Sequence, residues 1–231
     1  MARGLAMPAV PASSPDRPGS GEQGNTPVAF LDRLRNIVGS ENCLAREGEL
    51  FAYECDGLTL EPRRPLAVVL PATTAEVSGV VRVCREFEID FVPRGAGTGL
   101  SGGAHATKDS ILIECSRLGR VIEVNGEDRF AVVQPGVVNA ELSTQIAHLG
   151  LFYAPDPSSQ IVCSIGGNVA ENSGGVHCLK YGLTTNNILG IEFVLISGEV
   201  IRIGGKHLDS GGYDLLGVIT GSEGLLGVIT E

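Results

Sequence analysis

Hydrophobic positions repeat with a helical period in three stretches of the chain. Within each stretch, apolar residues return every three or four positions, which places them on one face of a helix. Each stretch begins with a residue whose side chain can accept a hydrogen bond from the first turn, namely Thr26, Thr73 and Asn139. Glu76 completes a capping box with Thr73. The pattern therefore predicts amphipathic helices at residues 27–38, 73–87 and 139–149.

Short apolar runs in the first half of the chain predict buried strands. Residues 65–71, 91–93 and 111–115 are too short for helices and are bounded by proline, glycine or polar residues. The helix predicted at 73–87 lies between the first two runs. Strand, helix and strand then form a βαβ unit, in which the two strands run parallel.

Apolar runs separated by turn residues indicate antiparallel strands in the second half. Two runs flank Asn125-Gly126, a strong signal for a hairpin turn. Residues 187–203 predict two further strands around Ser197-Gly198-Glu199. The hexapeptide Leu-Leu-Gly-Val-Ile-Thr occurs at 215–220 and again at 225–230. We expect the first copy to be helical and the second to turn into a strand.

Glycine is unusually dense directly after the predicted strand at 91–93. Five of the nine residues from Gly95 to Gly103 are glycine, and Arg94 precedes them. Glycine lets successive N–H groups point into one concavity and lets a ligand lie on the main chain. An arginine fork suits phosphate. The stretch predicts a loop that cradles phosphate or pyrophosphate, although a glycine-rich surface turn would have a similar composition.

The same stretch also fits two other motifs. Residues 97–102 match G-x-G-x-x-G, and residues 99–103 match G-x-S-x-G with Ser101 as the nucleophile. Both motifs require a helix directly after the loop. The next element here is the strand predicted at 111–115. This excludes a nicotinamide-type Rossmann site and leaves a serine hydrolase acting through Ser101 as a weak alternative.

A second glycine-containing segment lies at residues 164–175. Ser164 can cap a short helix whose first turn contains Gly166 and Gly167. Glycines at a helix N-terminus would leave N–H groups accessible to an anion or to the edge of a carbonyl-rich ring. A small-residue helix packed on a sheet is the alternative. Residues 221–224 form a third glycine-rich loop.

Composition and charge exclude several classes of protein. The chain has 231 residues and a net charge of −10, which argues against nucleic acid and anionic membranes as partners. No apolar run approaches the ~18 residues of a membrane span. Residues 1–26 read as a disordered extension without a secretory signal, so we expect a cytoplasmic protein, with any membrane association through partner subunits. The spacing of cysteine and histidine predicts no metal site.

Four blocks of the sequence together resemble the FAD-binding domain of the vanillyl-alcohol oxidase / p-cresol methylhydroxylase flavoprotein superfamily. Within it, the match is to the FAD subunits of glycolate oxidase and their D-lactate dehydrogenase relatives. The resemblance implies an α+β fold with FAD between two α/β subdomains, at 27–118 and 119–231. The blocks that carry the resemblance are residues 93–103, 154–159, 163–182 and 220–231.

The resemblance also implies which residues contact FAD. The first block would hold the pyrophosphate, the middle blocks would line the flavin and ribityl side, and the last block would close the site. The cofactor contacts predicted in this way are Pro93, Arg94, Gly95, Ala96, Gly97, Thr98, Gly99, Gly102, Gly103, Pro155, Asp156, Ser158, Cys163, Ser164, Gly166, Gly167, Asn168, Ala170, Ser173, Gly221, Glu223, Gly224 and Ile229.

The implied reaction is hydride transfer from the α-carbon of a 2-hydroxy acid, glycolate or D-lactate, to the flavin. Some superfamily members bind FAD covalently through a histidine in the first loop. Thr98 stands at the corresponding position here, so we expect non-covalent FAD. The family enzyme also works beside an iron–sulfur subunit that accepts the electrons, which makes such a partner an expectation.

Related enzymes continue past the point that corresponds to Glu231 into a substrate-binding cap domain. We expect that domain, absent from this sequence, to carry the base and the groups that bind the substrate carboxylate, and we predict no catalytic residue within the chain. The alternative is a truncated module that holds FAD without turnover of its own.

Overall fold

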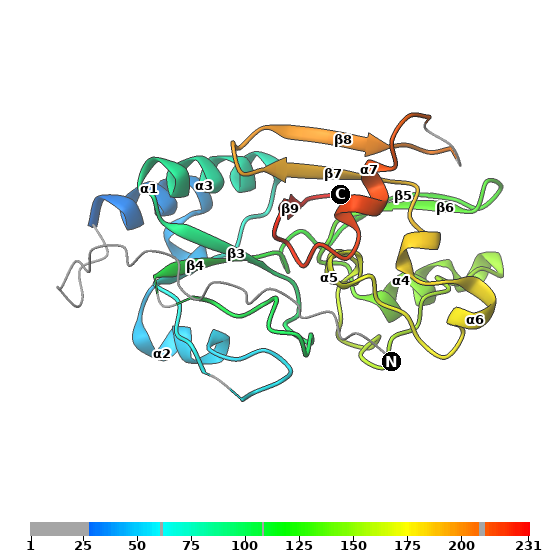
Figure 1. The fold of residues 1–231 in the computed structure, drawn as a ribbon, viewed down its shortest axis with the longest axis horizontal. Coiled ribbons are helices and arrows are strands. Elements are labelled where there is room, and N and C mark those ends of the chain that lie inside the picture. The colour runs from blue at the N-terminus through cyan, green and yellow to red at the C-terminus, as the bar shows by residue number, and fades with distance from the viewer. Residues whose placement is uncertain (1–27, 61, 108, 208–210) are drawn as a thin grey trace, which may run out of the picture.

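The computed structural model describes residues 28–231 except 61, 108 and 208–210, and its elements are those of a mixed α/β protein (Figure 1). The extension expected at 1–26 and the cap expected at Thr26 lie outside the described residues. The α-helices are α1 (Val28–Val38), α2 (Glu47–Leu50), α3 (Thr74–Glu86), α4 (Asn139–Ile146), α5 (Ile165–Glu171), α6 (Cys178–Tyr181) and α7 (Leu215–Ile219). The strands are β1 (Cys43–Leu44), β2 (Ala67–Val69), β3 (Asp90–Arg94), β4 (Ser110–Glu114), β5 (Val121–Asn125), β6 (Phe130–Val133), β7 (Gly190–Leu195), β8 (Val200–Gly204) and β9 (Gly227–Ile229). Single 3₁₀ turns lie at Ser40–Asn42, Phe51–Tyr53, Ala147–Leu149 and Thr184–Asn186.

The first half of the chain forms a four-stranded sheet in the order β1-β2-β4-β3. Strands β2, β4 and β3 run parallel, and β1 pairs antiparallel with β2. The predicted βαβ unit is confirmed as β2, α3 and β3, but β4 lies between its two strands. The carboxyl ends of β3 and β4 therefore meet at one edge of the sheet.

Both faces of this sheet are buried, which explains why its strands are continuously apolar. Val69, Ile111 and Ile113 belong to the core cluster that includes residues of α1 and α3. The alternate residues Val68 and Leu112 pack on the opposite face with Leu50 of α2. The sheet is thus a middle layer between two helical layers.

The second half contains a three-stranded antiparallel sheet, β8-β7-β9, and the separate β5–β6 hairpin. The predicted hairpin is confirmed, but its connection is longer than Asn125-Gly126 alone. The Asn125 side chain accepts a hydrogen bond from the Asp128 N–H at 2.9 Å, and Arg129 takes a positive φ of 57°. These local contacts extend the turn to residues 126–129 before β6 begins.

The two copies of the repeated hexapeptide adopt different structures, as predicted. The first copy forms α7, where the Asp214 carboxylate accepts a hydrogen bond from the Gly217 N–H at 2.8 Å. The second copy forms β9, in which Val228 pairs with Val194 of β7. A side-chain cap and a free strand edge therefore decide the structure of identical residues.

The predicted caps of two helices have different outcomes. The Thr73 side chain accepts a hydrogen bond from the Glu76 N–H at 3.2 Å, as expected. The Glu76 carboxylate, however, accepts its hydrogen bond from the Ala72 N–H at 2.8 Å and not from the Thr73 N–H. Asn139 is not a cap, because the helix already includes it. Its buried amide instead donates to the Pro155 carbonyl at 2.9 Å, a partner that spacing along the chain does not reveal.

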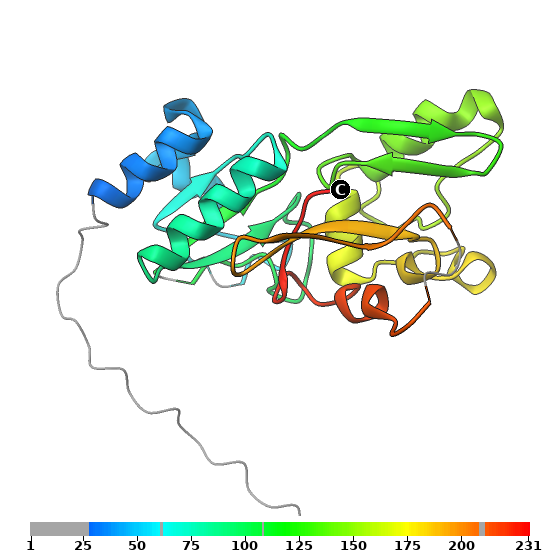
Figure 2. The same cartoon turned by 90° about the horizontal axis from the view of Figure 1, so that it is seen from above.

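Helix α3 attaches the second half of the chain to the first. Thr74, Ser78 and Arg82 lie four residues apart on one face of the helix. Thr74 donates to Glu192 at 2.6 Å, while Ser78 and Arg82 both donate to the Gly198 carbonyl, at 2.6 and 3.1 Å. Figures 1 and 2 show the β7–β8 ribbon reaching α3 in both views.

Residues of the second half also belong to the core of the first. Val194 of β7 and Val228 of β9 are buried in the cluster that contains the inner residues of α1 and α3. The two halves therefore pack through a common core. The boundary between subdomains at 118/119 stays a prediction.

Within the part of the chain that the structure describes, no helix combines the length and apolar character needed to cross a membrane. Helix α3 has 13 residues, whereas a spanning helix needs about 20.

We expect Ser78→Ala to lower the free energy of unfolding by about 1 kcal/mol, because it removes a buried hydrogen bond to the Gly198 carbonyl. Arg82 still satisfies that carbonyl, so the cost stays moderate. Urea unfolding measures the change. Thr144→Ala, which removes a similar bond on the exposed face of α4, is the matched control and should leave stability nearly unchanged. Equal effects of the two substitutions would contradict the proposed importance of the α3 contact.

Candidate functional site

The three glycine-rich segments meet at a cavity of about 490 Å³ between the two halves of the chain. All but four of the predicted site residues line it. The exceptions are Gly102, Pro155, Asp156 and Gly221. The structure thus brings together segments that lie more than a hundred residues apart, while the role of each residue in binding stays a prediction.

Helix α5 holds the three segments together. Gly95 of the first segment approaches it so closely that an added Cβ would lie 2.4 Å from Ser164 Oγ. The third segment is attached to the other end of α5, since Gly221 and Glu223 donate their N–H groups to Val169 and Ala170 at 2.8 and 2.9 Å. Figure 1 shows α5 in the centre of the molecule.

The main chain of the first segment lines the cavity with N–H groups that are free to donate hydrogen bonds. We call residues 95–104 the glycine loop. None of its backbone N–H groups donates to another described residue, although the carbonyls of Gly99 and Gly102 accept bonds from Gly57 and His105. A row of unpaired N–H groups along a cavity wall forms an anion nest. This geometry fits the phosphate cradle predicted for the loop.

Asn168 adds a buried donor without a strong acceptor. Asn168 is 1% exposed and belongs to the residues that line the cavity. The Nδ2 atom interacts with the Cys163 thiol, a weak acceptor, and makes no hydrogen bond of ordinary geometry with the described residues. Burial of an amide without an acceptor is costly. Because the Nδ2 atom itself is buried, it is not open to the cavity, and the contact with FAD expected for Asn168 stays a prediction.

The donors expected at the N-terminus of α5 are not available, so that prediction was wrong. The Gly166 N–H donates to the Pro135 carbonyl at 2.8 Å, and the Gly167 N–H donates to Ser164 Oγ at 3.2 Å. Ser164 does cap the helix, as predicted, and in doing so it uses one of the expected donors. Gly166 serves close packing instead, because an added Cβ would lie 2.4 Å from Pro135 Cβ.

The side chain of Arg94 is also engaged within the protein. Its guanidinium donates to the Cys55 carbonyl at 2.8 Å and to the Ala104 carbonyl at 3.1 Å. Burial lowers the pKa of Arg94, while the nearby carboxylates of Glu114 and Asp56 oppose that shift. Burial likewise raises the pKa of Glu114. Arg94 therefore belongs to a buried charge cluster behind the glycine loop.

Several cavity residues were not predicted as contacts, and Glu171 is the most polar of them. It lies one helical turn after Asn168, so the face of α5 that carries Asn168 could have indicated it. Ser101 Oγ donates to Glu171 Oε2 at 3.0 Å, which offers no support for the hydrolase alternative. The other lining residues beyond the prediction are Leu100, Ser101, Ala104, Cys115, Pro135, Ser159, Gly227 and Val228.

Pro155 and Asp156 hold a neighbouring loop rather than line the cavity. The Pro155 carbonyl accepts from Asn139. The Asp156 carboxylate lies 2.6 Å from the His177 ring, and this hydrogen bond lowers the pKa of Asp156. Pro155 thus contacts α4 and Asp156 contacts the residue before α6, and neither residue lines the cavity.

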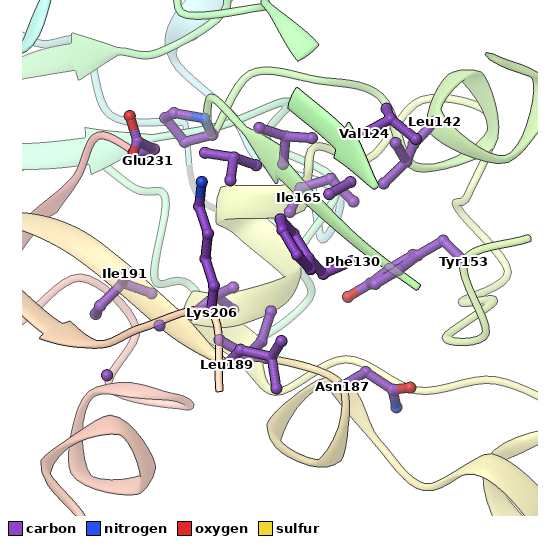
Figure 3. Close-up of a pocket in the computed structure, with 18 of the residues that line it drawn as sticks. Val124, Phe130, Leu142, Tyr153, Ile165, Asn187, Leu189, Ile191, Lys206 and Glu231 are labelled. Atoms are coloured by element: carbon purple, nitrogen blue, oxygen red, sulfur yellow. The ribbon is translucent and has the colours of Figure 1, made fainter. Parts of the chain in front are cut away.

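A larger cavity of about 650 Å³ lies behind the first, between the β5–β6 hairpin and β7 (Figure 3). The two cavities share Pro135, Gly166 and Ile229 as a common wall. Figure 3 shows apolar side chains such as Phe130 and Ile165 around the larger space. The smaller cavity is the better candidate for an anionic ligand despite its size, because it has the unpaired N–H groups.

Among the described residues, no group of three or more histidine, cysteine, aspartate or glutamate side chains is placed to hold a metal ion.

Comparison with known families identifies the cofactor of the domain. A family model described as "FAD binding domain" matches residues 65–204. The chain belongs to this FAD-binding family. FAD is therefore the cofactor of the domain, and a dinucleotide with a pyrophosphate fits a cavity bordered by the glycine loop.

The chain is similar to curated proteins that are more than twice as long. It is 51% identical over 204 residues to the "Glycolate oxidase subunit GlcD" of Escherichia coli (strain K12), covering 88% of this chain and 41% of that protein. It is 39% identical over 207 residues to the "D-lactate dehydrogenase" of Archaeoglobus fulgidus, covering 88% of this chain and 45% of that protein. The chain thus spans less than half the length of these relatives.

Solved structures share the fold at low sequence identity. The alkyldihydroxyacetonephosphate synthase structure aligns with a TM-score of 0.77 at 22% identity, over 87% of this chain and 39% of that one. A substrate-bound p-cresol methylhydroxylase aligns with a TM-score of 0.70 at 21% identity, over 87% and 41% of the two chains. These alignments show that the chain shares the fold of these proteins.

We expect Gly166→Ala to lower the free energy of unfolding by about 1–3 kcal/mol, because the added methyl group would overlap Pro135. The displacement would also narrow the FAD cavity and weaken FAD binding. Urea unfolding and FAD titration measure the two effects. Gly48→Ala in α2, where no atom lies within 4 Å of the added Cβ, is the matched control. If Gly166→Ala has the stability and FAD affinity of the wild type, then Pro135 can move to make room for the methyl group, and the predicted overlap is wrong.

Proposed function

We propose that the chain is the FAD-binding part of an oxidoreductase that oxidises a 2-hydroxy acid, glycolate or D-lactate, to the 2-oxo acid. The observation that carries the proposal is the cavity lined by unpaired glycine-loop N–H groups, in a chain that is 51% identical to a glycolate oxidase subunit. The similarity to a D-lactate dehydrogenase supports the same substrate class.

In this proposal, each part of the cavity has a separate task. The N–H groups of the glycine loop bind the pyrophosphate. The wall of Pro135, Gly166 and Ile229 limits how deeply the cofactor enters. When bound, FAD supplies the hydride acceptor at its flavin ring. We assign no catalytic base within the chain.

The cofactor is held without a covalent bond in this proposal. Thr98 lies on the cavity wall at the position where some superfamily members carry the linking histidine. Residues 94–104 contain neither histidine nor cysteine. The thiol of Cys163 also lines the cavity, but burial raises its pKa, which disfavours the reactive thiolate.

The whole enzyme would work with partner subunits. The glycolate oxidase relatives are named as subunits, and hydride removal requires a later electron acceptor, for which we propose an iron–sulfur subunit. A cytoplasmic location is part of the same proposal. The alternative is an FAD-binding module without turnover of its own.

We expect the purified chain, after reconstitution with FAD, to show a two-banded flavin absorption spectrum. Acid or heat should release the chromophore completely as free FAD, because no covalent bond holds it. Spectroscopy of the supernatant and the precipitate measures the release. Flavin that stays with the precipitated protein would contradict the non-covalent assignment. A chain that is colourless once the unbound FAD has been removed would contradict FAD binding itself.

Anaerobic addition of glycolate or D-lactate separates the enzyme from the module. If the chain carries the activity, the longer-wavelength flavin band should bleach with one of these acids, and chemical reduction by dithionite marks full bleaching. L-lactate is the stereochemical control. A spectrum that responds to dithionite but to none of the hydroxy acids would favour the module for this chain.

A further inference from the structure

Arg94 lies behind the glycine loop and is almost completely buried. Arg94 is 8% exposed, and its guanidinium carbon lies 5.8 Å from the centre of the Tyr53 ring. Two of its nitrogens donate to backbone carbonyls, Nη2 to Cys55 at 2.8 Å and Nη1 to Ala104 at 3.1 Å. The planar fork of the side chain is therefore occupied by the protein itself.

The two carbonyls bound by Arg94 have particular positions in the chain. Arg94 directly precedes the glycine loop, and Ala104 is the last residue of that loop. The Arg94–Ala104 bond therefore links the two ends of the loop. The Arg94–Cys55 bond fixes the closed loop to a neighbouring segment, whose Gly57 N–H donates to the Gly99 carbonyl at 3.1 Å.

The loop depends on such external contacts because it makes few of its own. None of its N–H groups has a partner among the described residues, and half of residues 95–104 are glycine. Glycine loses more conformational entropy on ordering than any other residue. Without support, an FAD-free loop of this composition would sample many shapes, and FAD binding would bear the cost of ordering it.

The turn of the loop is built directly over the guanidinium. Gly97 has a φ of +66°, and a Cβ added there would lie 2.3 Å from Arg94 Nη2. The space under the turn is therefore filled by Arg94. The Glu114 and Asp56 carboxylates act electrostatically on the same guanidinium, so neighbouring charges of the protein already compensate it.

From these contacts we propose that Arg94 is a positioning residue, which holds the glycine loop in its ligand-binding shape before FAD arrives. The sequence suggests a phosphate ligand at this position, whereas the bonds to Cys55 and Ala104 point to a clamp. The proposal deepens the proposed function, since the loop that it positions is the FAD cradle. The clamp consists only of bonds within the chain, so it can be tested in FAD-free protein.

Limited proteolysis with thermolysin, which cleaves before leucine, measures how often the glycine loop opens. Leu100 is 67% exposed near the centre of the loop. We expect Arg94→Lys to accelerate cleavage at Gly99–Leu100 in FAD-free protein by on the order of tenfold, because one amine cannot replace two bonds from a planar fork. The cleavage rate follows the population of the open loop when opening is fast. Mass spectrometry of timed samples measures the rate.

Two controls accompany this measurement. Leu179 is 98% exposed in α6, far from the clamp in sequence, so cleavage before it should proceed at the same rate in all variants. Arg117→Lys removes a comparable bond from an arginine to the Leu70 carbonyl, outside the loop, and should behave as wild type. If Arg94→Lys is cleaved everywhere because it does not fold, Gly97→Ala is the second variant. It keeps Arg94 but forces a methyl group against the guanidinium, and it should also accelerate cleavage at Leu100.

A different result would overturn the proposal. If both variants in FAD-free protein are cleaved before Leu100 at the wild-type rate while FAD affinity falls, then Arg94 acts on the ligand and the clamp is wrong. The outcome does not depend on FAD binding. A chain that failed to bind FAD but showed accelerated cleavage in the two variants would contradict the proposed function and still support the clamp.

Discussion

The buried contact between α3 and the β7–β8 ribbon fixes the relative position of the two halves of the chain. Thr74, Ser78 and Arg82 make it through hydrogen bonds on one face of the helix. Because β9 pairs with β7, the position of the ribbon also determines the position of the loop that leads into β9. That loop lines the cavity beside the glycine loop, since a Cβ added at Gly103 would lie 3.3 Å from Glu223 Cβ. The α3 contact and the bonds from Gly221 and Glu223 to α5 together hold the walls of the cavity in place.

The cavity itself is made more of backbone than of side chains. Its donors are main-chain N–H groups, and its close contacts involve glycines that face Ser164 and Pro135. A site of this kind depends on the shape of the chain, because the donors are present in any sequence. Side chains such as those of Ser164 and Asn139 hold backbone segments in place.

Local signals predicted most elements of the fold. The apolar period and the Thr73 cap gave α3, and the runs at 65–71 and 111–115 gave β2 and β4. Glycine density together with the family resemblance indicated most residues of the cavity. The errors arose where a polar group has a distant partner. Asn139 binds Pro155, the Gly166 N–H binds Pro135, and such partners follow from the tertiary structure rather than from spacing along the chain.

The repeated hexapeptide has a consequence for folding. The copies at 215–220 and 225–230 have identical side chains, so each could offer the same strand to the free edge of β7. Pairing of the first copy would shift the register and pull the third glycine-rich loop away from α5. The Asp214 cap, which is local and so can form early, commits the first copy to a helix. Glycine occupies the corresponding position before the second copy, at Gly224, so Asp214 is the local feature that distinguishes the two copies.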